Sequence, residues 1–436
     1  MSTDPTPPED REKAIEEILR KLEEKLRRDL NVDPGSLDEM EDQTQSIGDD
    51  FKRLLDEELA KRKGKDQQSQ SRSLCTLRCP CGAKARSLGL RTRHIVLLSG
   101  VQTFRRVYYH CSGCHRGFAP MDDWLGVGQA QVSHRVAGLL GRLSCYLPDR
   151  LVARELSDLF GVVLAVRTVQ RYSQRIGASM KTEANHQVEQ WKHRNLPPSE
   201  ERPSRLHITM DGVMLHVDGD WHEAKVGCVY QTDPMGKGIK SRYIATMERS
   251  AQFGRHLCVL GHQSGTHRCR DLATVADGAE WIWQEVGKYF PRSVQVLDYY
   301  HATEHLWEAA RLRFGEGSAK ASDWMTQQKE RLLNDQVDLV ICEVEKWRPR
   351  QPQKCVVRKR LVGYLQTHRH RMNYGMLKRA GYHTGSGMVE SACKNVVQTR
   401  MKRAGMRWSA PGAEAKLQMC RWFSSYQRTS LNQYLQ

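Results

Sequence analysis

The chain has 436 residues and carries 68 Lys and Arg against 51 Asp and Glu, a formal net charge of +17. This length allows two or three domains, each with its own core. No run of 18 or more apolar residues is present, which excludes a membrane-spanning helix, and the polar N-terminal residues do not resemble a signal peptide. We therefore expect a cytoplasmic protein. Residues 1–70 lean acidic, so the basic excess lies in the remainder and favours a nucleic acid partner.

Residues 1–73 are predicted to form a helical region followed by a linker. Five apolar residues recur there at helical intervals: Ile15, Ile18, Leu19, Leu22 and Leu26. The segment FKRLLDEELAKRK repeats the pattern, whereas NVDPGSLDEMEDQTQSIGDD predicts a polar linker and KGKDQQSQSRS a flexible connector. A helical pair of this kind is more often a packing or self-association element than a catalytic one.

Residues 74–125 are predicted to be a zinc ribbon. Two close cysteine pairs, separated by β-rich sequence, supply four ligands: Cys79, Cys81, Cys111 and Cys114. The first pair is one residue tighter than the usual CxxC, so Cys75 or His110 could replace one ligand. The alternative is a chance clustering of thiols. A site of four thiolates has no open position, so we expect its zinc to be structural.

Residues 126–200 are predicted to contain a helix-turn-helix. Apolar positions from Leu151 to Phe160 are followed by a break at Gly161 and then by Val169 and Tyr172 at helical spacing. The second helix displays side chains suited to phosphates and base edges: Arg167, Gln170, Arg171 and Gln174. A generic helical hairpin is the alternative. The polar, proline-bearing segment before residue 200 indicates a domain boundary.

From residue 205 the pattern changes to strands. RLHITMDGVMLHV places Asp211 inside an apolar strand, where a carboxylate must be hydrogen-bonded or bind a cation. Two further strands, a helix, a strand ending at Asp277, a second helix and a strand over Val294–Leu297 follow. This is the element order of the ribonuclease H-like fold, in which a carboxylate of the first strand lies beside one at the end of the fourth.

Such paired carboxylates suit phosphodiester chemistry with two divalent cations, Mg²⁺ or Mn²⁺, about 4 Å apart. A third carboxylate is needed from a later helix, and Glu390 in GYHTGSGMVESACKNVVQTRMKRAGMRW is the candidate. The alternative is an ordinary helix-start glutamate favoured by the helix dipole. The same segment carries basic residues that we expect to contact DNA: Lys394, Arg400, Lys402, Arg403 and Arg407.

Several of these motifs resemble those of the bacterial insertion-sequence DDE transposases, the Kra group in particular, which is related to the Mutator-like transposases. The motifs are MDGV, VADGAEWIW followed by FP, LDYYHATEH, GSGMVES and GMRW. The resemblance covers roughly residues 75–425 and implies metal-dependent cleavage and strand transfer of DNA. It also implies a catalytic core over 201–301 and 384–425, a helical insertion over 302–383 and a tail over 426–436. CPCG departs from the usual zinc knuckle.

The resemblance also bears on the second carboxylate. Asp298 and His301 match a Cys/Asp-x-x-His motif that Mutator-like transposases carry one strand after their second catalytic aspartate. Asp298 lies one helix and one strand too late for the fourth-strand position. We therefore choose Asp277, and expect Asp298 and His301 to support the site or to position DNA. The opposite choice, Asp298 as a ligand, is the alternative.

The implied partners are the terminal inverted repeats of the chain's own element, target DNA and a second copy of the chain, because joining two ends requires at least two active sites. The chain would then act at the bacterial nucleoid. Two other functions are considered: a transposase-derived DNA-binding regulator without catalysis, and a ribonuclease H-like nuclease. A purely structural helical scaffold fits poorly with aspartates placed in strands.

Overall fold

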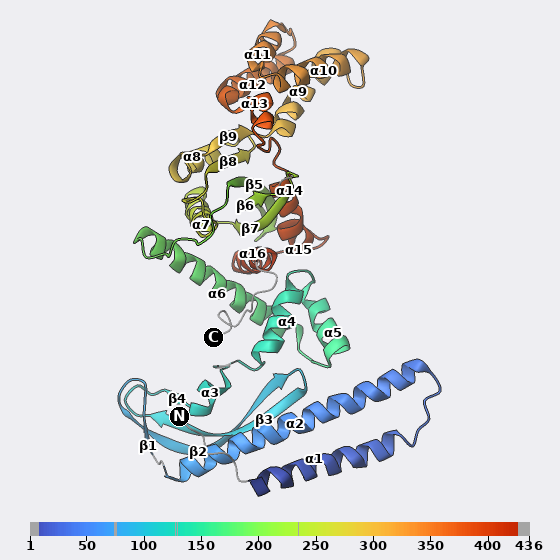
Figure 1. Cartoon of the computed structure of the whole chain (residues 1–436), viewed down its shortest axis with the longest axis vertical. Helices are drawn as coiled ribbons and strands as arrows, with labels where there is room; N and C mark the ends of the chain where they lie inside the picture. Colours follow the sequence, from blue (N-terminus) through green and yellow to red (C-terminus); the bar gives the residue numbers. More distant parts are fainter. Residues whose placement is uncertain (1–7, 74–75, 127, 129, 234, 426–436) are drawn as a thin grey trace. The chain divides into compact units, whose positions relative to one another are not determined.

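The computed structural model describes residues 8–73, 76–126, 128, 130–233 and 235–425 (Figure 1). It is a mixed α/β protein with a four-stranded sheet and a five-stranded sheet. Contacts divide the chain into two units, the first ending at Tyr172 and the second beginning at Ser173. None of the helices in the described ranges combines the length and apolarity needed to cross a membrane.

Unit 1 begins with two long helices, α1 (Pro8–Asp29) and α2 (Leu37–Ser73). The sequence predicted a polar linker over residues 31–50 and a flexible connector over 63–73. Both predictions are wrong in extent, because α2 covers most of the linker and all of the connector. Ser36 caps the helix by accepting a hydrogen bond from the backbone N–H of Glu39. Ion pairs one turn apart, such as Arg53 with Asp50 and Glu57, then stabilise a helix that has few apolar residues.

The sheet of unit 1 is antiparallel, in the order β1-β2-β3-β4. Its strands are β1 (Thr76–Arg78), β2 (Lys84–Leu97), β3 (Gly100–Cys111) and β4 (Gly117–Phe118). Helix α2 packs along β3, where the side-chain amide of Gln102 donates to the backbone carbonyl of Arg53. A short helix, α3 (Pro120–Leu125), follows, and its Asp122 pairs with Arg93 and Arg106 of the sheet.

Three helices complete unit 1 and lead into unit 2: α4 (His134–Ser144), α5 (Asp149–Phe160) and α6 (Val166–Lys192). Gly161 ends α5 in the left-handed conformation, with φ of 63°. Val152 and Leu156 of α5 are buried, as is Val169 of α6. The predicted pair of helices separated by a break at Gly161 is therefore present in the structure.

The sheet of unit 2 has the order β7-β6-β5-β8-β9. Its strands are β5 (Arg205–Val217), β6 (Asp220–Thr232), β7 (Gly238–Thr246), β8 (Asp271–Ala276) and β9 (Val294–Leu297). The first three pair antiparallel, and β8 and β9 continue the sheet parallel to β5. The connecting helices are α7 (Ser250–Gln263) and α8 (Glu280–Tyr289). All five predicted strands and both helices are present.

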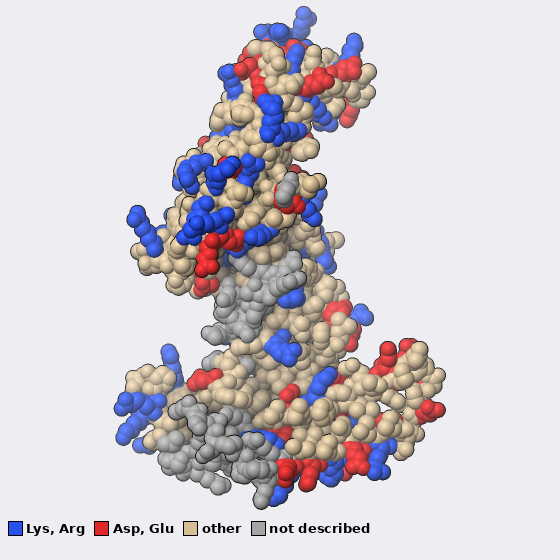
Figure 2. Space-filling view, viewed as in Figure 1, with Lys and Arg blue, Asp and Glu red and all other residues tan. Residues whose placement is uncertain are grey.

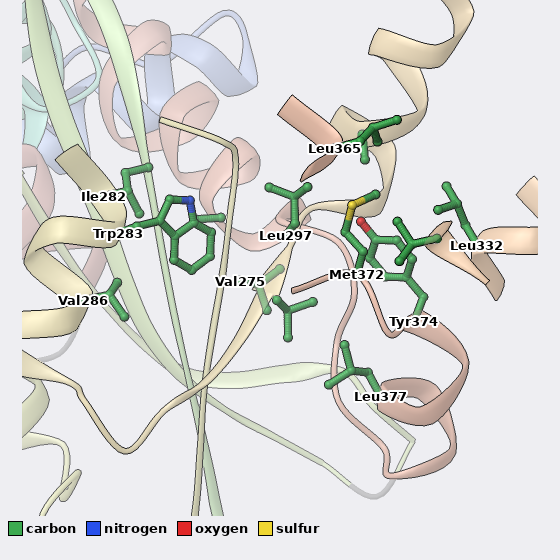
Figure 3. Close-up of a cluster of buried hydrophobic side chains, with 14 of the residues drawn as sticks. Val275, Ile282, Trp283, Val286, Leu297, Leu332, Leu365, Met372, Tyr374 and Leu377 are labelled. Atoms are coloured by element: carbon green, nitrogen blue, oxygen red, sulfur yellow. The ribbon is translucent and has the colours of Figure 1, made fainter. Parts of the chain in front are cut away.

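A helical segment follows β9, as the resemblance implied. Its helices are α9 (Tyr299–Phe314), α10 (Ala319–Leu333), α11 (Val337–Lys346), α12 (Pro352–His368), the 3₁₀ turn η1 (Arg369–Arg371) and α13 (Tyr374–Arg379). The segment shares one hydrophobic core with the sheet. Figure 3 shows Val275 and Leu297 of β8 and β9 between Trp283 of α8 and a group that includes Leu365 and Tyr374. This continuous core fixes the segment against the ends of β8 and β9.

The chain then returns to the sheet through short helical pieces: α14 (Gly387–Ala392), the π-helix η2 (Cys393–Gln398), α15 (Thr399–Met401) and α16 (Ala410–Ser425). Glu390 was expected on a helix, and it lies on α14, which continues directly into the π-helical η2. Between α15 and α16, the backbone carbonyl of Trp408 accepts from the N–H of Asp218 at the end of β5. The GMRW motif therefore anchors this segment to the sheet.

Candidate functional site

The four predicted zinc ligands of unit 1 come together. Each offers a sulfur atom, and the sulfur atoms of Cys79, Cys81, Cys111 and Cys114 all lie within 4.8 Å of one another. The sulfurs of Cys79 and Cys114 are 3.6 Å apart, as are those of Cys81 and Cys111. Thiolates around a tetrahedral zinc with bonds of about 2.3 Å lie roughly 3.8 Å apart, so the group fits such an ion.

Local turns explain how the tight CPCG spacing still delivers two ligands. The backbone N–H of Gly82 donates to the carbonyl of Cys79, and Gly82 adopts φ of 91°, which favours glycine. The N–H of Cys79 then donates to the carbonyl of Ala83, so both cysteines of the pair sit on one tight turn. Of the two replacements considered, His110 is not in the group and Cys75 lies outside the described residues.

The thiols of this group do not titrate alike. A backbone hydrogen bond from Cys114, with a second from Gly113, lowers the pKa of Cys111 to about 7. A backbone hydrogen bond from Cys81 favours the thiolate of Cys79, but burial and the neighbouring thiols outweigh it and raise the pKa of Cys79 to about 12. Four thiolates this close together would repel one another, and a bound cation would relieve that repulsion.

In unit 2, three aspartates form a row across neighbouring parallel strands, Asp211 within β5 and Asp277 and Asp298 directly after the ends of β8 and β9. Met210 of β5 is in register with Ala276 of β8, which in turn is in register with Leu297 of β9. The next residue on each strand is an aspartate: Asp211, Asp277 and Asp298. Asp277 is thus on the strand next to Asp211, whereas Asp298 is two strands away, about 10 Å at the usual strand spacing.

Asp211 is half-buried, and its carboxylate has two hydrogen-bond donors. The backbone N–H of Gly212 donates to Oδ1 at 2.7 Å, and the thiol of Cys393 donates to Oδ2 at 3.5 Å. Burial nevertheless raises the pKa of Asp211, and the charge of Asp277 raises it further. Two carboxylates that repel each other in a partly buried site are suited to binding a cation between them.

Asp277 is held by the chain that follows it. Its Oδ1 accepts from the backbone N–H of Ala279, and its backbone carbonyl accepts from the indole N–H of Trp283. Gly278, between Asp277 and Ala279, has no room for a side chain, because a Cβ there would lie 2.3 Å from the ring of Tyr364. The turn after β8 is therefore packed directly under helix α12.

Asp298 has a different environment, because its oxygens are already engaged by the backbone. It is the N-cap of α9 and accepts from the N–H of His301 at 2.8 Å, while its other oxygen accepts from the N–H of Ser386. Its exposed fraction is 1%. The Asp-x-x-His motif is thus a helix cap that also binds the turn before α14.

Glu390 lies in the first turn of α14 and is exposed. The hydroxyl of Ser386 donates to its carboxylate at 3.2 Å, so Ser386 connects Glu390 to Asp298. Among the described residues, the four cysteines are the only group of three or more His, Cys, Asp or Glu side chains that meet within 4.8 Å. The structure therefore places Asp211 and Asp277 on adjacent strands, but the carboxylates of Asp211, Asp277 and Glu390 do not all lie within 4.8 Å of one another.

Two residues at this site were not anticipated from the sequence. Cys393 lies one turn after Glu390 and contacts Asp211, a spacing that a helical wheel would have placed on one face. Tyr364 comes from α12, and the charges of Asp277 and Asp298 act on its hydroxyl. No local pattern in the helical segment marks Tyr364, because only tertiary packing brings it to the strand ends.

The candidate DNA contacts differ in accessibility. Arg167, Gln170 and Arg171 are exposed on α6, and one guanidinium N–H of Arg171 donates to the side chain of Gln131. Gln174 belongs to unit 2 and lines a cavity of about 560 Å³ with residues of α16.

Near Glu390, four of the five basic residues are exposed: Lys394, Lys402, Arg403 and Arg407. Arg400 is the exception, because its exposed fraction is 2% and its guanidinium lies over the ring of Trp408 at 4.9 Å. The prediction that Arg400 contacts DNA is therefore wrong for this structure. Figure 2 shows Lys and Arg side chains gathered over α7 and α8 and over the helices from α9 to α13.

No protein-family model matches the chain, and no curated protein is significantly similar to it in sequence.

Proposed function

We propose that the chain is a DDE transposase that cleaves and joins DNA at the ends of its own insertion sequence. The observation that carries this proposal is the register of Asp211 and Asp277, which directly follow the last paired residues of the adjacent parallel strands β5 and β8. The sheet order β7-β6-β5-β8-β9, with three antiparallel strands followed by two parallel ones, supports a ribonuclease H-like core. A carboxylate pair at this place is suited to phosphodiester chemistry.

The donors present fit magnesium or manganese, which prefer carboxylate oxygens. Asp211, Asp277 and Glu390 would hold two such ions. When bound, the ions would activate the attacking oxygen and stabilise the leaving oxygen of a DNA strand. The protein's own part is positional: Gly212 and Cys393 orient the Asp211 carboxylate, and the turn after β8 orients Asp277.

Asp298 supports this arrangement without serving as a ligand. Its carboxylate binds the backbone of His301 and Ser386 and so ties the start of α9 to the turn that precedes Glu390. His301 lies near enough for its charge to act on Asp211. Loss of Asp298 would therefore displace Glu390 rather than remove a metal ligand.

Unit 1 would recognise the ends of the element. Two helices separated by a turn at Gly161, α5 and α6, support the proposal of a helix-turn-helix, in which Arg167 and Arg171 would be exposed on the recognition helix. Zinc held by the four cysteines would stabilise the small sheet beside them. We propose that two copies of the chain assemble on a pair of ends, since both ends must be cut and joined.

The proposal is tested with DNA carrying the inverted repeats that flank the gene. Purified chain and the variants Asp211→Asn, Asp277→Asn and Glu390→Gln are incubated with this DNA and Mg²⁺ or Mn²⁺. Asp338→Asn, a change at an exposed aspartate of α11, is the matched control. We expect specific nicking and joining by wild type and control only, with DNA binding retained by all variants. Binding without any cleavage would favour a regulator, and equal cleavage of unrelated DNA would favour a nuclease.

A further inference from the structure

The helical segment places a tyrosine, Tyr364, near the row formed by Asp211, Asp277 and Asp298. The hydroxyl of Tyr364 is buried and has no hydrogen-bond partner in the part of the chain that the structure describes. Buried polar atoms are paired in most proteins, and an unpaired one is unfavourable. A phenylalanine would fill the same space without that cost. What distinguishes this hydroxyl is the position of its ring against the turn that carries Asp277.

The position of the Tyr364 ring is fixed by its neighbours. Its centroid lies 4.4 Å from the ring of His305 on α9 and 4.9 Å from the ring of His368 on α12. The guanidinium of Arg371 lies 2.9 Å from Nδ1 of His368 and over the ring of Trp283. On the remaining side is Gly278, whose lack of a side chain makes room for the ring. The tyrosine is therefore held rigidly against the turn that carries Asp277.

The electrostatic surroundings of the hydroxyl decide its role as a donor. Burial raises the pKa of Tyr364, and the charges of Asp277 and Asp298 raise it further. A tyrosine hydroxyl is in any case neutral at physiological pH and can donate one hydrogen bond. Neither carboxylate accepts that bond within the described structure. Because the hydroxyl oxygen is shielded from solvent, an anionic group placed beside Asp277 would accept the bond only after a local rearrangement around the tyrosine.

We propose that Tyr364 is a further catalytic residue, whose hydroxyl donates a hydrogen bond to a non-bridging oxygen of the DNA phosphate bound beside Asp277. This inference rests on the proposed function, since it names a contact to the same substrate. It also gives the helical segment a direct part in the site. The sheet supplies the carboxylates, and α12 supplies a neutral donor to the phosphate that they position.

The test compares Tyr364→Phe with Tyr374→Phe in the full-length chain. Tyr374 is the matched control, because its hydroxyl is also buried and unpartnered among the described residues. It lies in the hydrophobic core, where burial is the main cause of its raised pKa and the charge of Asp298 is a further one. Both changes keep the ring, so packing and thermal stability should be retained. Two quantities are measured: the rate of strand cleavage in Mn²⁺, and the affinity for a DNA end in Ca²⁺ by fluorescence anisotropy.

We expect Tyr364→Phe to lose about tenfold or more in both quantities, as for a hydrogen bond to a charged group, and Tyr374→Phe to match wild type. If Tyr364→Phe matches Tyr374→Phe while Asp211→Asn is inactive, the role of Tyr364 is wrong and the transposase proposal stands. If wild type is no more active than Asp211→Asn, the proposed function fails, and the phosphate contact fails with it.

Discussion

The thiol of Cys393 donates a hydrogen bond to Oδ2 of Asp211 across 3.5 Å. This contact joins the middle of the sheet to the first residue of the π-helix η2, which directly follows the helix that carries Glu390. Burial raises the pKa of Cys393, and the charge of Asp211 raises it further, so the sulfur keeps its proton and acts as a donor. π-Helical turns within α-helices often occur at functional sites, and this one brings the thiol to the carboxylate.

Removal of this donor should alter the pH dependence of catalysis. The hydrogen bond from Cys393 lowers the pKa of Asp211, so Cys393→Ala should raise that pKa further. Since the site needs the ionised carboxylate, the acidic limb of the cleavage rate should move to higher pH. Cys393→Ser keeps a donor and should resemble wild type. A buried cysteine of α7, Cys258, provides the control change to alanine. An unchanged profile in Cys393→Ala would show that the contact does not tune Asp211.

The raised pKa of Asp211 also predicts an effect on stability without metal. A carboxyl group whose pKa is higher in the folded state stabilises the fold at low pH, and this contribution is lost as pH rises through the folded-state pKa. At neutral pH the ionised Asp211 therefore destabilises the metal-free protein. Asp211→Asn should unfold at a higher temperature than wild type in EDTA, with a smaller difference near pH 4 than at pH 8. Mn²⁺ should stabilise wild type only. A less stable variant at neutral pH would contradict this account.

Much of unit 2 could be predicted from the sequence because its strands are apolar runs, one interrupted by Asp211 and two followed directly by Asp277 and Asp298. Counting elements placed Asp277, rather than Asp298, beside Asp211, and the observed register has the same order. Contacts that depend on tertiary packing could not be predicted in this way. Tyr364 reaches the site only because α12 packs on Gly278. Arg400 belongs to a basic run that suggests a surface, yet its guanidinium packs over Trp408.

The predictions for the N-terminal half had a different outcome. The cysteine pairs were sufficient to predict a metal site, since each pair is brought together by a local turn. The length of α2 was missed because its residues are polar, and a polar segment was interpreted as a linker. Helix propensity and ion pairs one turn apart, such as that of Arg62 with Glu58, stabilise a helix without an apolar face.

The cysteine group should contain about one zinc ion per chain, as expected for a four-thiolate structural site. Cys111→Ser should lose the metal and expose residues 76–118 to proteolysis, because zinc binding and folding are coupled in small ribbons. Cys342→Ser, at an exposed cysteine of α11, should retain both metal and protection. Metal content by mass spectrometry and limited proteolysis provide the measurements. A metal-free preparation with a protected ribbon would contradict the assignment.

Recognition of DNA ends should depend on α6. Binding of a DNA end by the wild-type chain should weaken steeply with added salt. Arg167→Ala and Arg171→Ala should lower the affinity, by about 1–3 kcal/mol if either side chain contacts a base. Arg20→Ala removes an exposed arginine of α1 that is paired with Glu17 and Glu24, and it should bind normally. Anisotropy titrations at several salt concentrations measure the effect. Normal binding by both α6 variants would show that this helix does not recognise the DNA end.

The most direct measurement is the position of manganese in crystals of the chain bound to a DNA end, located by anomalous scattering. We predict a peak shared by the carboxylates of Asp211 and Asp277, about 2.1 Å from an oxygen of each, with Glu390 moved into contact with the metal site. Asp298 should retain its bonds to the backbone of His301 and Ser386. A peak bound by Asp298 with Asp277 turned away, or the absence of metal at Asp211, would contradict the proposed site.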